Sequence, residues 1–335
     1  MAPSTPATGF VAAIGATPLV RLTHLVRRTD VAVWAKLEGC NPGGSAKDRS
    51  AWAMLRRALA DGTVARGGTI IESSSGNLGM ALARLCAVHG VRFVCVADEH
   101  ASPLALDVIR ALGGTVRMVD GPDPATGELL VARRTLVREL LAQDPSAVTL
   151  DQYANPAPLE AHAEGTMREI TEALGAVDEV YVATSTTGTL GGCVRWLRDH
   201  GPATRVVAVD PVGSVLFGGE QGPRSLGGFG AGAVPPLAEL AQPDAVARVA
   251  EVDAVVGARH LARTEGILPG ASGGAVIAAL LGRLDGLPAG ARVAVVLHDF
   301  GWAYLHSIYD DAWVQQHLGV APDQLAAAVA RSMAR

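Results

Sequence analysis

Short apolar runs rich in Val and Ile alternate along the chain with longer segments in which Ala and Leu recur at helical spacing. Continuous apolar runs of about four to eight residues indicate strands buried on both faces, whereas apolar residues three and four positions apart indicate helices. We expect strands at Val31–Lys36, Gly68–Glu72, Val91–Ala97, Thr115–Val119, Glu179–Thr184, Arg205–Asp210 and Arg292–His298. We expect helices at Asp48–Asp61, Leu78–His89, Ser102–Leu112, Gly127–Gln143, Pro158–Leu174, Thr189–His200 and Gly273–Arg283. This alternation predicts an α/β fold with parallel sheets.

The chain has 335 residues, of which 49% are hydrophobic and 18% are charged. This balance indicates a packed globular protein rather than a disordered one, and the length allows two ordinary domains. The stretch Gly218–Pro236 is rich in Gly and Pro and predicts a long irregular connection, which in a compact enzyme is often functional. A second turn-rich break lies at Asp120–Gly127.

The charge pattern excludes several classes of partner. The net charge is −5, and no cluster of Lys and Arg is dense enough to form a nucleic-acid surface. The sequence lacks a secretory signal pattern at its start and an apolar run near the ~18 residues of a membrane helix, so we expect a cytoplasmic protein without a membrane partner. The cysteines lie far apart without His neighbours, so we expect buried apolar side chains and no metal site; they are Cys40, Cys86, Cys95 and Cys193.

Three loops rich in Gly, Ser and Thr precede predicted helices, at Glu72–Gly79, Thr184–Thr189 and Gly270–Ala275. Open α/β sheets bind ligands at the carboxyl ends of their strands. Hydroxyls and backbone N–H groups at a helix N-terminus suit anions, a carboxylate at the first loop and a phosphate at the second. The second loop lacks both the Gly-Lys-Ser/Thr ending and the GxGxxG pattern, so the phosphate should belong to neither ATP nor a dinucleotide. The alternative for each loop is an ordinary helix cap.

Lysine is so scarce in this chain that each one needs an explanation. Lys36 and Lys47 are the lysines, and the remaining basic residues are arginine. Lys47 follows a glycine turn at the start of a predicted helix, beside Asp48 and Arg49. The positive end of the helix and Arg49 favour the uncharged amine that imine formation requires. The alternative is a solvated lysine at a helix start.

Together these motifs resemble one family, the cysteine synthase-like branch of the fold-type II pyridoxal phosphate (PLP) enzymes. In chain order they are Gly15–Leu22, Lys36–Glu38, Asn41–Arg49, Ser74–Asn77, Ser185–Thr189 and Ser272–Gly273, and they span almost the whole chain. The resemblance implies a tryptophan synthase β-like fold of two three-layer α/β/α domains with mostly parallel sheets. It assigns residues 1–40 and 151–335 to a large PLP-binding domain and residues 41–150 to a small mobile domain.

The resemblance also assigns the site. Lys47 is implied to be the catalytic residue that holds pyridoxal 5′-phosphate as a Schiff base. The remaining cofactor ligands are implied to be Asn77 at the 3′-oxygen, Ser185, Thr186, Thr187, Gly188 and Thr189 at the phosphate, and Ser272 at the pyridine nitrogen. The substrate carboxylate would be bound by Ser74, Ser75, Gly76 and Gln152. A neutral Ser272 leaves the pyridine nitrogen unprotonated, which favours β-elimination over transamination.

Departures from ordinary cysteine synthases indicate a subfamily. Ser185–Thr189 stands where Gly-Thr-Gly-Gly-Thr is usual, and Tyr153 follows Gln152 where Phe is commoner. With Val209–Gly218, these features are similar to siderophore- and antibiotic-pathway enzymes that join O-phospho-L-serine and L-glutamate by β-replacement into a precursor of L-2,3-diaminopropionate. Arg133 matches the position of an arginine that meets the leaving phosphate, with help from Tyr153 and Ser185. The alternative for Arg133 is an exposed helix charge.

One departure and three further expectations complete the sequence-based picture. Ala303 stands where relatives usually carry an arginine. The alternative activities are those of a cysteine synthase or an O-phosphoserine sulfhydrylase. A non-catalytic PLP-binding regulatory protein is more remote, because the set Lys47, Asn77 and Ser272 is intact. The expected partners are small amino-acid substrates and a second copy of the chain in a homodimer.

Overall fold

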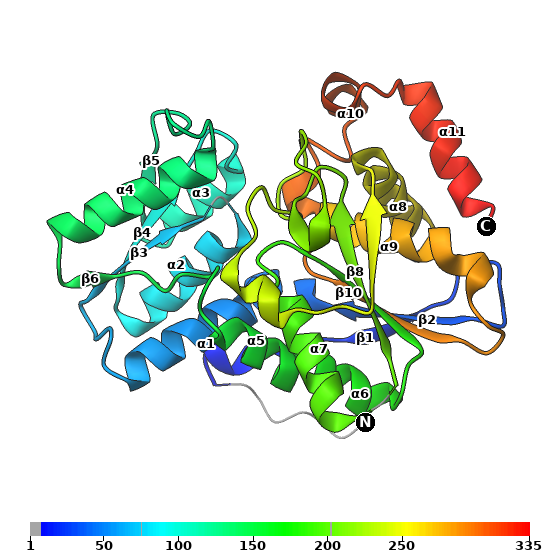
Figure 1. The fold of residues 1–335 in the computed structure, drawn as a ribbon, viewed down its shortest axis with the longest axis horizontal. Helices are drawn as coiled ribbons and strands as arrows, with labels where there is room; N and C mark the ends of the chain where they lie inside the picture. Colours follow the sequence, from blue (N-terminus) through cyan, green and yellow to red (C-terminus); the bar gives the residue numbers. More distant parts are fainter. Residues whose placement is uncertain (1–7, 75, 202) are drawn as a thin grey trace. The chain divides into compact units, whose positions relative to one another are not determined.

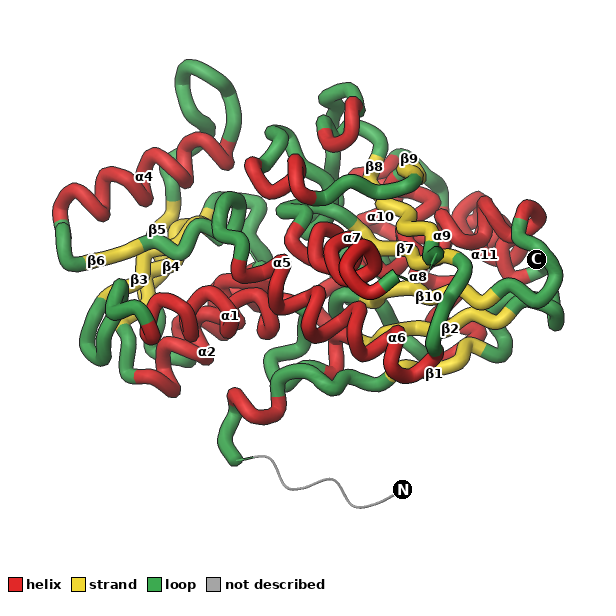
Figure 2. The backbone as a smooth tube through the Cα atoms, turned by 60° about the horizontal axis from the view of Figure 1, so that its bottom comes forward, coloured by secondary structure: helices red, strands yellow, loops and turns green. Residues whose placement is uncertain are grey.

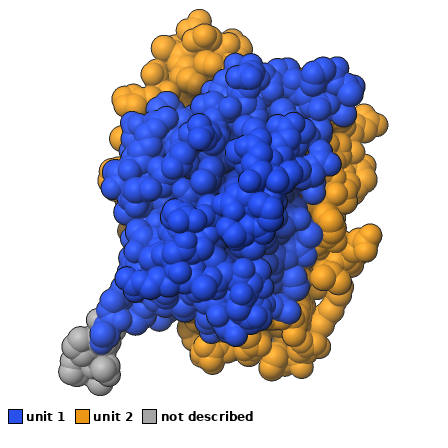
Figure 3. All heavy atoms as spheres, turned by 90° about the vertical axis from the view of Figure 1, so that its left-hand side faces the viewer, with its two compact units in different colours: residues 1–16, 41–158 blue, residues 17–40, 159–335 orange. Residues whose placement is uncertain are grey.

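The computed structural model describes residues 8–74, 76–201 and 203–335. The chain divides into two compact units (Figure 3). The first combines the residues up to Ala16 with Asn41–Pro158, and the second combines Thr17–Cys40 with Leu159–Arg335. Each unit contains one of the two sheets, so each is described by itself.

The second unit is built on a six-stranded sheet of order β1-β2-β10-β7-β8-β9 (Figures 1 and 2). Only β1 is antiparallel to its neighbour among these strands; the others run parallel. The strands are β1 (Leu19–Leu22), β2 (Ala32–Leu37), β7 (Glu179–Ala183), β8 (Arg205–Pro211), β9 (Ala245–Val249) and β10 (Arg292–Leu297).

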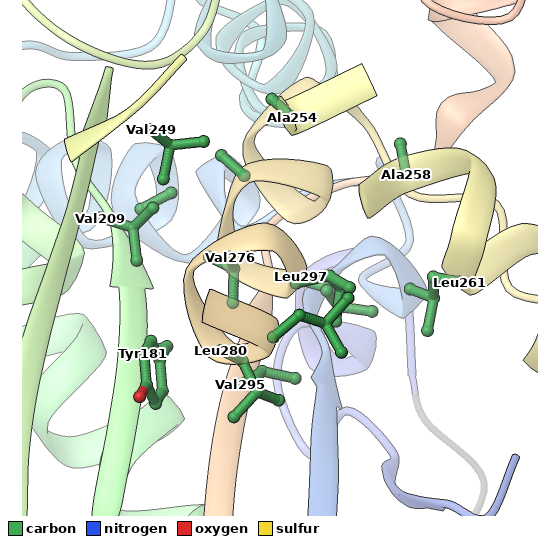
Figure 4. Packing of buried hydrophobic residues seen from close by; sticks show 14 of the residues in the cluster. Tyr181, Val209, Val249, Ala254, Ala258, Leu261, Val276, Leu280, Val295 and Leu297 are labelled. Atoms are coloured by element: carbon green, nitrogen blue, oxygen red, sulfur yellow. The ribbon is translucent and has the colours of Figure 1, made fainter. Parts of the chain in front are cut away.

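Side chains of the central strands alternate between two separate cores. Tyr181, Val295 and Leu297 pack with helices α8 (Glu251–Glu265) and α9 (Ala271–Arg283), as Figure 4 shows for one part of this core. The residues between them, such as Val182 and Val296, pack with α6 (Arg168–Leu174) and α7 (Gly188–His200) on the opposite face. Because both faces are covered, the strands are apolar throughout, which is why they were predictable as continuous Val-rich runs. The unit therefore has the expected three layers.

The first unit contains a four-stranded parallel sheet of order β5-β4-β3-β6. Its strands are β3 (Thr69–Ser73), β4 (Arg92–Ala97), β5 (Thr115–Met118) and β6 (Ala147–Val148). Ile70 and Phe93 pack on one face with α1 (Lys47–Ala60), α2 (Asn77–His89) and α3 (Pro103–Ala111). Ile71 and Val96 pack on the other face with α4 (Leu129–Gln143). The α/β class and the three-layer architecture are thus confirmed in this unit as well.

The helix expected at Pro158–Leu174 is interrupted. It consists of α5 (Ala157–Ala161), a π-helical turn at His162–Met167, and α6. Three strands and three helices were not predicted, namely β1, β6, β9, α8, α10 (Asp311–Leu318) and α11 (Pro322–Met333). The expected irregular stretch at Gly218–Pro236 contains no long element, only short 3-10 turns at its two ends. No described helix is long and apolar enough to cross a membrane.

The N-terminal segment joins the first unit as far as Ala16. Phe10, Val11 and Ile14 pack against the core of that unit, and the Gly15 backbone N–H donates to Asn41 Oδ1 at 2.9 Å. The sequence-based prediction places this N-terminal segment in the large domain and ends the small domain at residue 150. The compact unit instead includes the segment up to Ala16 and extends to Pro158. The functional labels of the two domains, cofactor-binding and mobile, stay predictions.

Candidate active site

Lys47 is the first residue of α1 and follows a tight loop in the first unit. Gly43 N–H donates to Asp48 Oδ2 at 2.6 Å, and the Lys47 N–H donates to Ser45 Oγ at 3.3 Å. A Cβ atom at Gly43 would overlap the Asp48 carboxylate, so the glycine is required for this close approach. The loop thus presents a half-buried lysine at the positive end of a helix.

The other lysine has a structural role. Lys36 is 1% exposed, and its Nζ lies 2.6 Å from Glu169 Oε2 and donates to the Thr17 carbonyl at 2.5 Å. A buried ammonium is stable when it is paired in this way. Of the two lysines, Lys47 is therefore the candidate for imine chemistry.

The loop between β3 and α2 is organised by Ser74. Its Oγ accepts hydrogen bonds from the N–H groups of Gly79 at 2.8 Å and Gly76 at 3.4 Å. An accepting hydroxyl still has its proton to donate, so Ser74 can serve both the loop and a carboxylate. Asn77 begins α2 immediately after this turn. Ser75, the remaining predicted member of the loop, lies outside the described residues.

Gln152 reaches the same loop from a distant part of the chain. Its side-chain Nε2 donates to the Ser73 carbonyl at 3.2 Å. The structure thus brings together Ser74, Gly76 and Gln152, as the resemblance implied, although it does not test their roles. The buried Ser73 hydroxyl has no hydrogen-bond partner among the described residues.

Glu72 is a buried residue whose importance the sequence did not reveal. Its Oε2 accepts from Thr149 Oγ1 at 3.1 Å and from the N–H groups of Leu150 and Asp151, both at 3.0 Å. These bonds fix the segment that carries Gln152. Burial raises the pKa of Glu72 to about 7. The signal available in the sequence was an acidic residue at the end of an otherwise apolar strand.

Arg133 is buried, which rules out its interpretation as an exposed helix charge. Its Nε lies 3.1 Å from Oδ2 of the buried Asp98, just beyond the end of β4. The neighbouring Arg134 is exposed, and its guanidinium carbon lies 6.0 Å from the centre of the Tyr153 ring. Burial raises the pKa of Tyr153. A cavity of about 450 Å³ in this unit is lined by Tyr153, Arg134 and Ser73, among other residues.

In the second unit, the loop between β7 and α7 is rich in buried hydroxyls. Thr184 Oγ1 donates to Asp210 Oδ1 at 2.8 Å, which ties the ends of β7 and β8 together. Thr187 has the left-handed backbone conformation (φ 64°) that is rare outside glycine and often marks functional loops. Thr187 is the third residue of Ser185–Thr189, where the usual Gly-Thr-Gly-Gly-Thr motif of cysteine synthases has Gly. Gly188 begins α7, so the backbone N–H groups of its first turn have no acceptor within the helix.

Ser272 is the second residue of α9 and is 7% exposed. The preceding Gly270 packs so closely on Asp299 that a Cβ atom there would overlap the Asp299 carboxylate. Asp299 in turn accepts from Tyr304 Oη at 2.8 Å, and burial raises the Tyr304 pKa well above its usual value. Ala303 is exposed, so the missing arginine leaves no gap in the core.

Comparison with known proteins places the chain in a family. Residues 11–299 match the model of the pyridoxal-phosphate dependent enzyme family. The chain belongs to this family, and its cofactor is pyridoxal 5′-phosphate.

Individual proteins within this family are similar to the chain over most of its length. The chain is 44% identical to an N-(2-amino-2-carboxyethyl)-L-glutamate synthase from Ralstonia nicotianae, over 92% of this chain and 91% of that protein. It is 41% identical to the enzyme of the same name from Cupriavidus metallidurans, over 91% and 90%. Among solved structures it is similar to an O-acetylserine dependent cystathionine β-synthase from Helicobacter pylori, with a TM-score of 0.84 and 31% identity over 91% of this chain and 100% of that one. An O-ureido-L-serine synthase matches with a TM-score of 0.82 and 34% identity over 91% and 98%.

The residues present fit this cofactor. The turn Thr184–Gly188 offers hydroxyls and backbone N–H groups at the positive end of α7, a donor set suited to a phosphate. Lys47 supplies a primary amine on a partly exposed helix start, and Ser272 supplies a neutral hydroxyl at another helix start.

Proposed function

We propose that this enzyme catalyses a β-replacement that joins O-phospho-L-serine and L-glutamate into N-(2-amino-2-carboxyethyl)-L-glutamate and releases phosphate. The observation that carries the proposal is the similarity to two synthases of this name, at 44% and 41% identity over more than nine-tenths of the chain. The product would be a precursor of L-2,3-diaminopropionate in siderophore or antibiotic biosynthesis.

Residues from several of the predicted motifs would bind the cofactor. Lys47 would bind it covalently, Asn77 would bind its 3′-oxygen, and the loop Ser185–Thr189 would bind its phosphate. Ser272 would face the pyridine nitrogen, and as a neutral hydroxyl it would leave that nitrogen unprotonated. When bound, pyridoxal phosphate supplies an electron sink for bond breaking at the substrate Cα and Cβ.

The amino-acid substrate would be bound through its carboxylate. Ser74, Ser75, Gly76 and Gln152 would be its ligands; the described members lie at one loop, where Ser74 keeps a hydroxyl proton to donate. Lys47 would carry the proton removed from the substrate Cα, because its amine becomes available when substrate displaces it from the cofactor.

Arg133 would meet the leaving phosphate, assisted by Tyr153 and Ser185. Oδ2 of Asp98 lies 3.1 Å from the Nε of Arg133, and the guanidinium has two terminal nitrogens besides this Nε. Those nitrogens suit bidentate binding of a dianion. The proposal has two further parts: a homodimer, which rests on the family resemblance, and a cytoplasmic location, which rests on the sequence pattern.

The test is phosphate release from O-phospho-L-serine by the purified protein, with and without L-glutamate. We expect release that depends on L-glutamate, and a new product with the mass of N-(2-amino-2-carboxyethyl)-L-glutamate. A Lys47→Ala variant should lose both the release and the visible absorption of the lysine–cofactor Schiff base.

A second pair of substrates distinguishes the main alternative. The neighbouring solved structures include an O-acetylserine dependent enzyme, so O-acetylserine with sulfide is the matched control reaction. Equal or faster turnover of that pair would assign the protein to cysteine synthesis instead. An unreactive protein that still binds the cofactor would support the non-catalytic alternative.

A further inference from the structure

The cavity of about 450 Å³ in the first unit lies beside the proposed substrate site but has polar groups of its own. One wall is a face of α4, and the other is formed by the end of β3 and the residues that follow β6. All of these segments belong to the first unit. A volume of this size suits a small metabolite. We call this space the α4 cavity.

One end of the α4 cavity carries groups of both charge signs. The Arg134 guanidinium carbon lies 6.0 Å from the centre of the Tyr153 ring, which lines the same space. Asp151 is held at this end because its backbone N–H donates to Glu72 Oε2 at 3.0 Å. Ser73, the residue after Glu72, adds a hydroxyl. A cation, a carboxylate and a hydroxyl thus line one part of the cavity.

The Ser73 hydroxyl provides separate evidence for a ligand. The residue is 4% exposed, and its Oγ has no hydrogen-bond partner among residues 8–74, 76–201 and 203–335. Because side chains alternate along a strand, Ser73 points to the same face of β3 as Ile71, which packs in the core beneath α4. A buried hydroxyl without a partner is costly, and a ligand that accepts its proton removes that cost.

Farther along α4 the cavity wall is apolar. Val137 and Leu141 follow Arg134 on one face of the helix, and Leu141 lies about 10 Å farther along the helix axis. Both apolar side chains pack in the core beneath α4. Arg138 is exposed and donates to Thr135 Oγ1 at 2.8 Å, outside the apolar wall. An apolar part of a ligand would therefore be buried at this end.

We propose that the α4 cavity binds a free α-amino acid with an apolar side chain. Its carboxylate binds Arg134 and accepts the Ser73 proton, and its side chain packs on Val137 and Leu141. Its ammonium group binds Asp151, whose carboxylate has about four acceptor sites, one of them used by the Tyr153 N–H at 3.2 Å. A phosphate or a dicarboxylate fits less well, because Asp151 repels a second negative charge.

The location of the cavity gives this site a regulatory role. Asp151 and Tyr153 flank Gln152 in the chain, and Gln152 Nε2 donates to the Ser73 carbonyl at 3.2 Å. An occupant therefore contacts the segment that carries Gln152, and its binding is coupled to the orientation of that side chain. The regulatory role rests on the proposed function, in which Gln152 binds the substrate carboxylate, whereas the binding itself does not.

The test is calorimetric titration of the holoenzyme with L-leucine, without substrates, while the visible absorption of the lysine–cofactor Schiff base is recorded. We expect saturable binding that leaves the absorption unchanged, because Lys47 does not line the cavity. Isocaproate lacks the ammonium group and isoamylamine lacks the carboxylate, so each should bind about tenfold more weakly. Glycine lacks the apolar side chain and should also bind about tenfold more weakly.

Binding that changes the visible absorption would place L-leucine at the cofactor and overturn the proposal. The absence of binding would overturn it as well. Equal affinity for L-leucine and glycine would overturn the assignment of an apolar side chain.

Variants locate the binding within the molecule. Arg134→Gln, at an exposed position, should weaken L-leucine binding about tenfold, and Ser73→Ala should weaken it about threefold. Arg117→Gln is the matched control, since this exposed arginine lies on β5 at the opposite edge of the same sheet, and it should bind as wild type does. Wild-type affinity in Arg134→Gln would overturn the assignment of the cavity.

The regulatory role has its own measurement. L-Leucine should change the KM for O-phospho-L-serine at least about twofold in wild type but not in Arg134→Gln. An unchanged KM at saturating L-leucine would overturn the regulatory role. A protein that binds L-leucine as expected but does not turn over O-phospho-L-serine would contradict the proposed function and support the site.

Discussion

At the scale of single residues, Glu72 couples the ionisation of one carboxyl group to the stability of the first unit. Burial raises its pKa from 4.5 to about 7, while three hydrogen bonds to Oε2 oppose the shift only partly. A raised pKa means that the fold prefers the protonated acid. The stabilisation is therefore complete below about pH 4.5 and is lost as the pH rises through about 7.

We expect Glu72→Gln to remove this pH dependence. Between pH 5 and 8 the free energy of unfolding of wild type should fall relative to the variant by about 2.5 kcal/mol, since one pKa unit corresponds to about 1.4 kcal/mol. Urea unfolding at several pH values measures the difference. Glu139→Gln, at an exposed position of α4, is the control and should run parallel to wild type. Parallel curves for Glu72→Gln as well would contradict the prediction.

At the scale of elements, the strands that could be predicted are those covered on both faces. β7 is buried at every position and β10 at every position after its first, and beyond the first residue each is a continuous apolar run. The unpredicted β1 and β9 are edge strands with partly exposed patterns, and β6 has only two residues. Edge strands contribute half as many ladder hydrogen bonds and less burial, so their sequences carry a weaker signal.

The contact between α7 and the π-helical turn gives a prediction at this scale. Gly192→Ala should lower the free energy of unfolding by about 2 kcal/mol, because the new Cβ overlaps the backbone of Leu159. Gly282→Ala is the matched control, since this helical glycine in α9 has open space around its Cβ direction. That control should be neutral or stabilising by up to about 1 kcal/mol. Similar effects of both substitutions on thermal unfolding would contradict the prediction, because they would show that the overlap with Leu159 does not destabilise the fold.

At the scale of the whole molecule, the motifs of the site could be predicted but their supports could not. Lys47, Ser74 and Thr187 stand in loops whose composition is unusual in the sequence itself. Glu72 accepts a hydrogen bond from Thr149, and His162 lies within hydrogen-bond distance of Thr189; these partners are 77 and 27 residues away in the chain, respectively. Nothing local distinguishes such a residue from an ordinary buried polar side chain, because its meaning depends on the tertiary contact.

The division into units predicts which fragments fold. β2 pairs with β10 along Ala32–Leu37, so a fragment of Leu159–Arg335 alone lacks a central strand of its sheet. We expect that fragment to show no cooperative thermal transition by circular dichroism. Thr17–Cys40 joined to it by a flexible linker should restore a transition. Cooperative unfolding of the shorter fragment would show that β2 is dispensable.

The pairing of β2 with β10 also has a consequence during synthesis on the ribosome. β2 leaves the exit tunnel early, but its partner Arg292–Leu297 is made only near the end of translation. The intervening first unit has its whole sheet within Thr69–Val148 and can fold while the chain is still growing. β2 therefore stays unpaired with β10 until translation is nearly complete, and we expect this long-range pairing to be the slow step in the folding of the second unit.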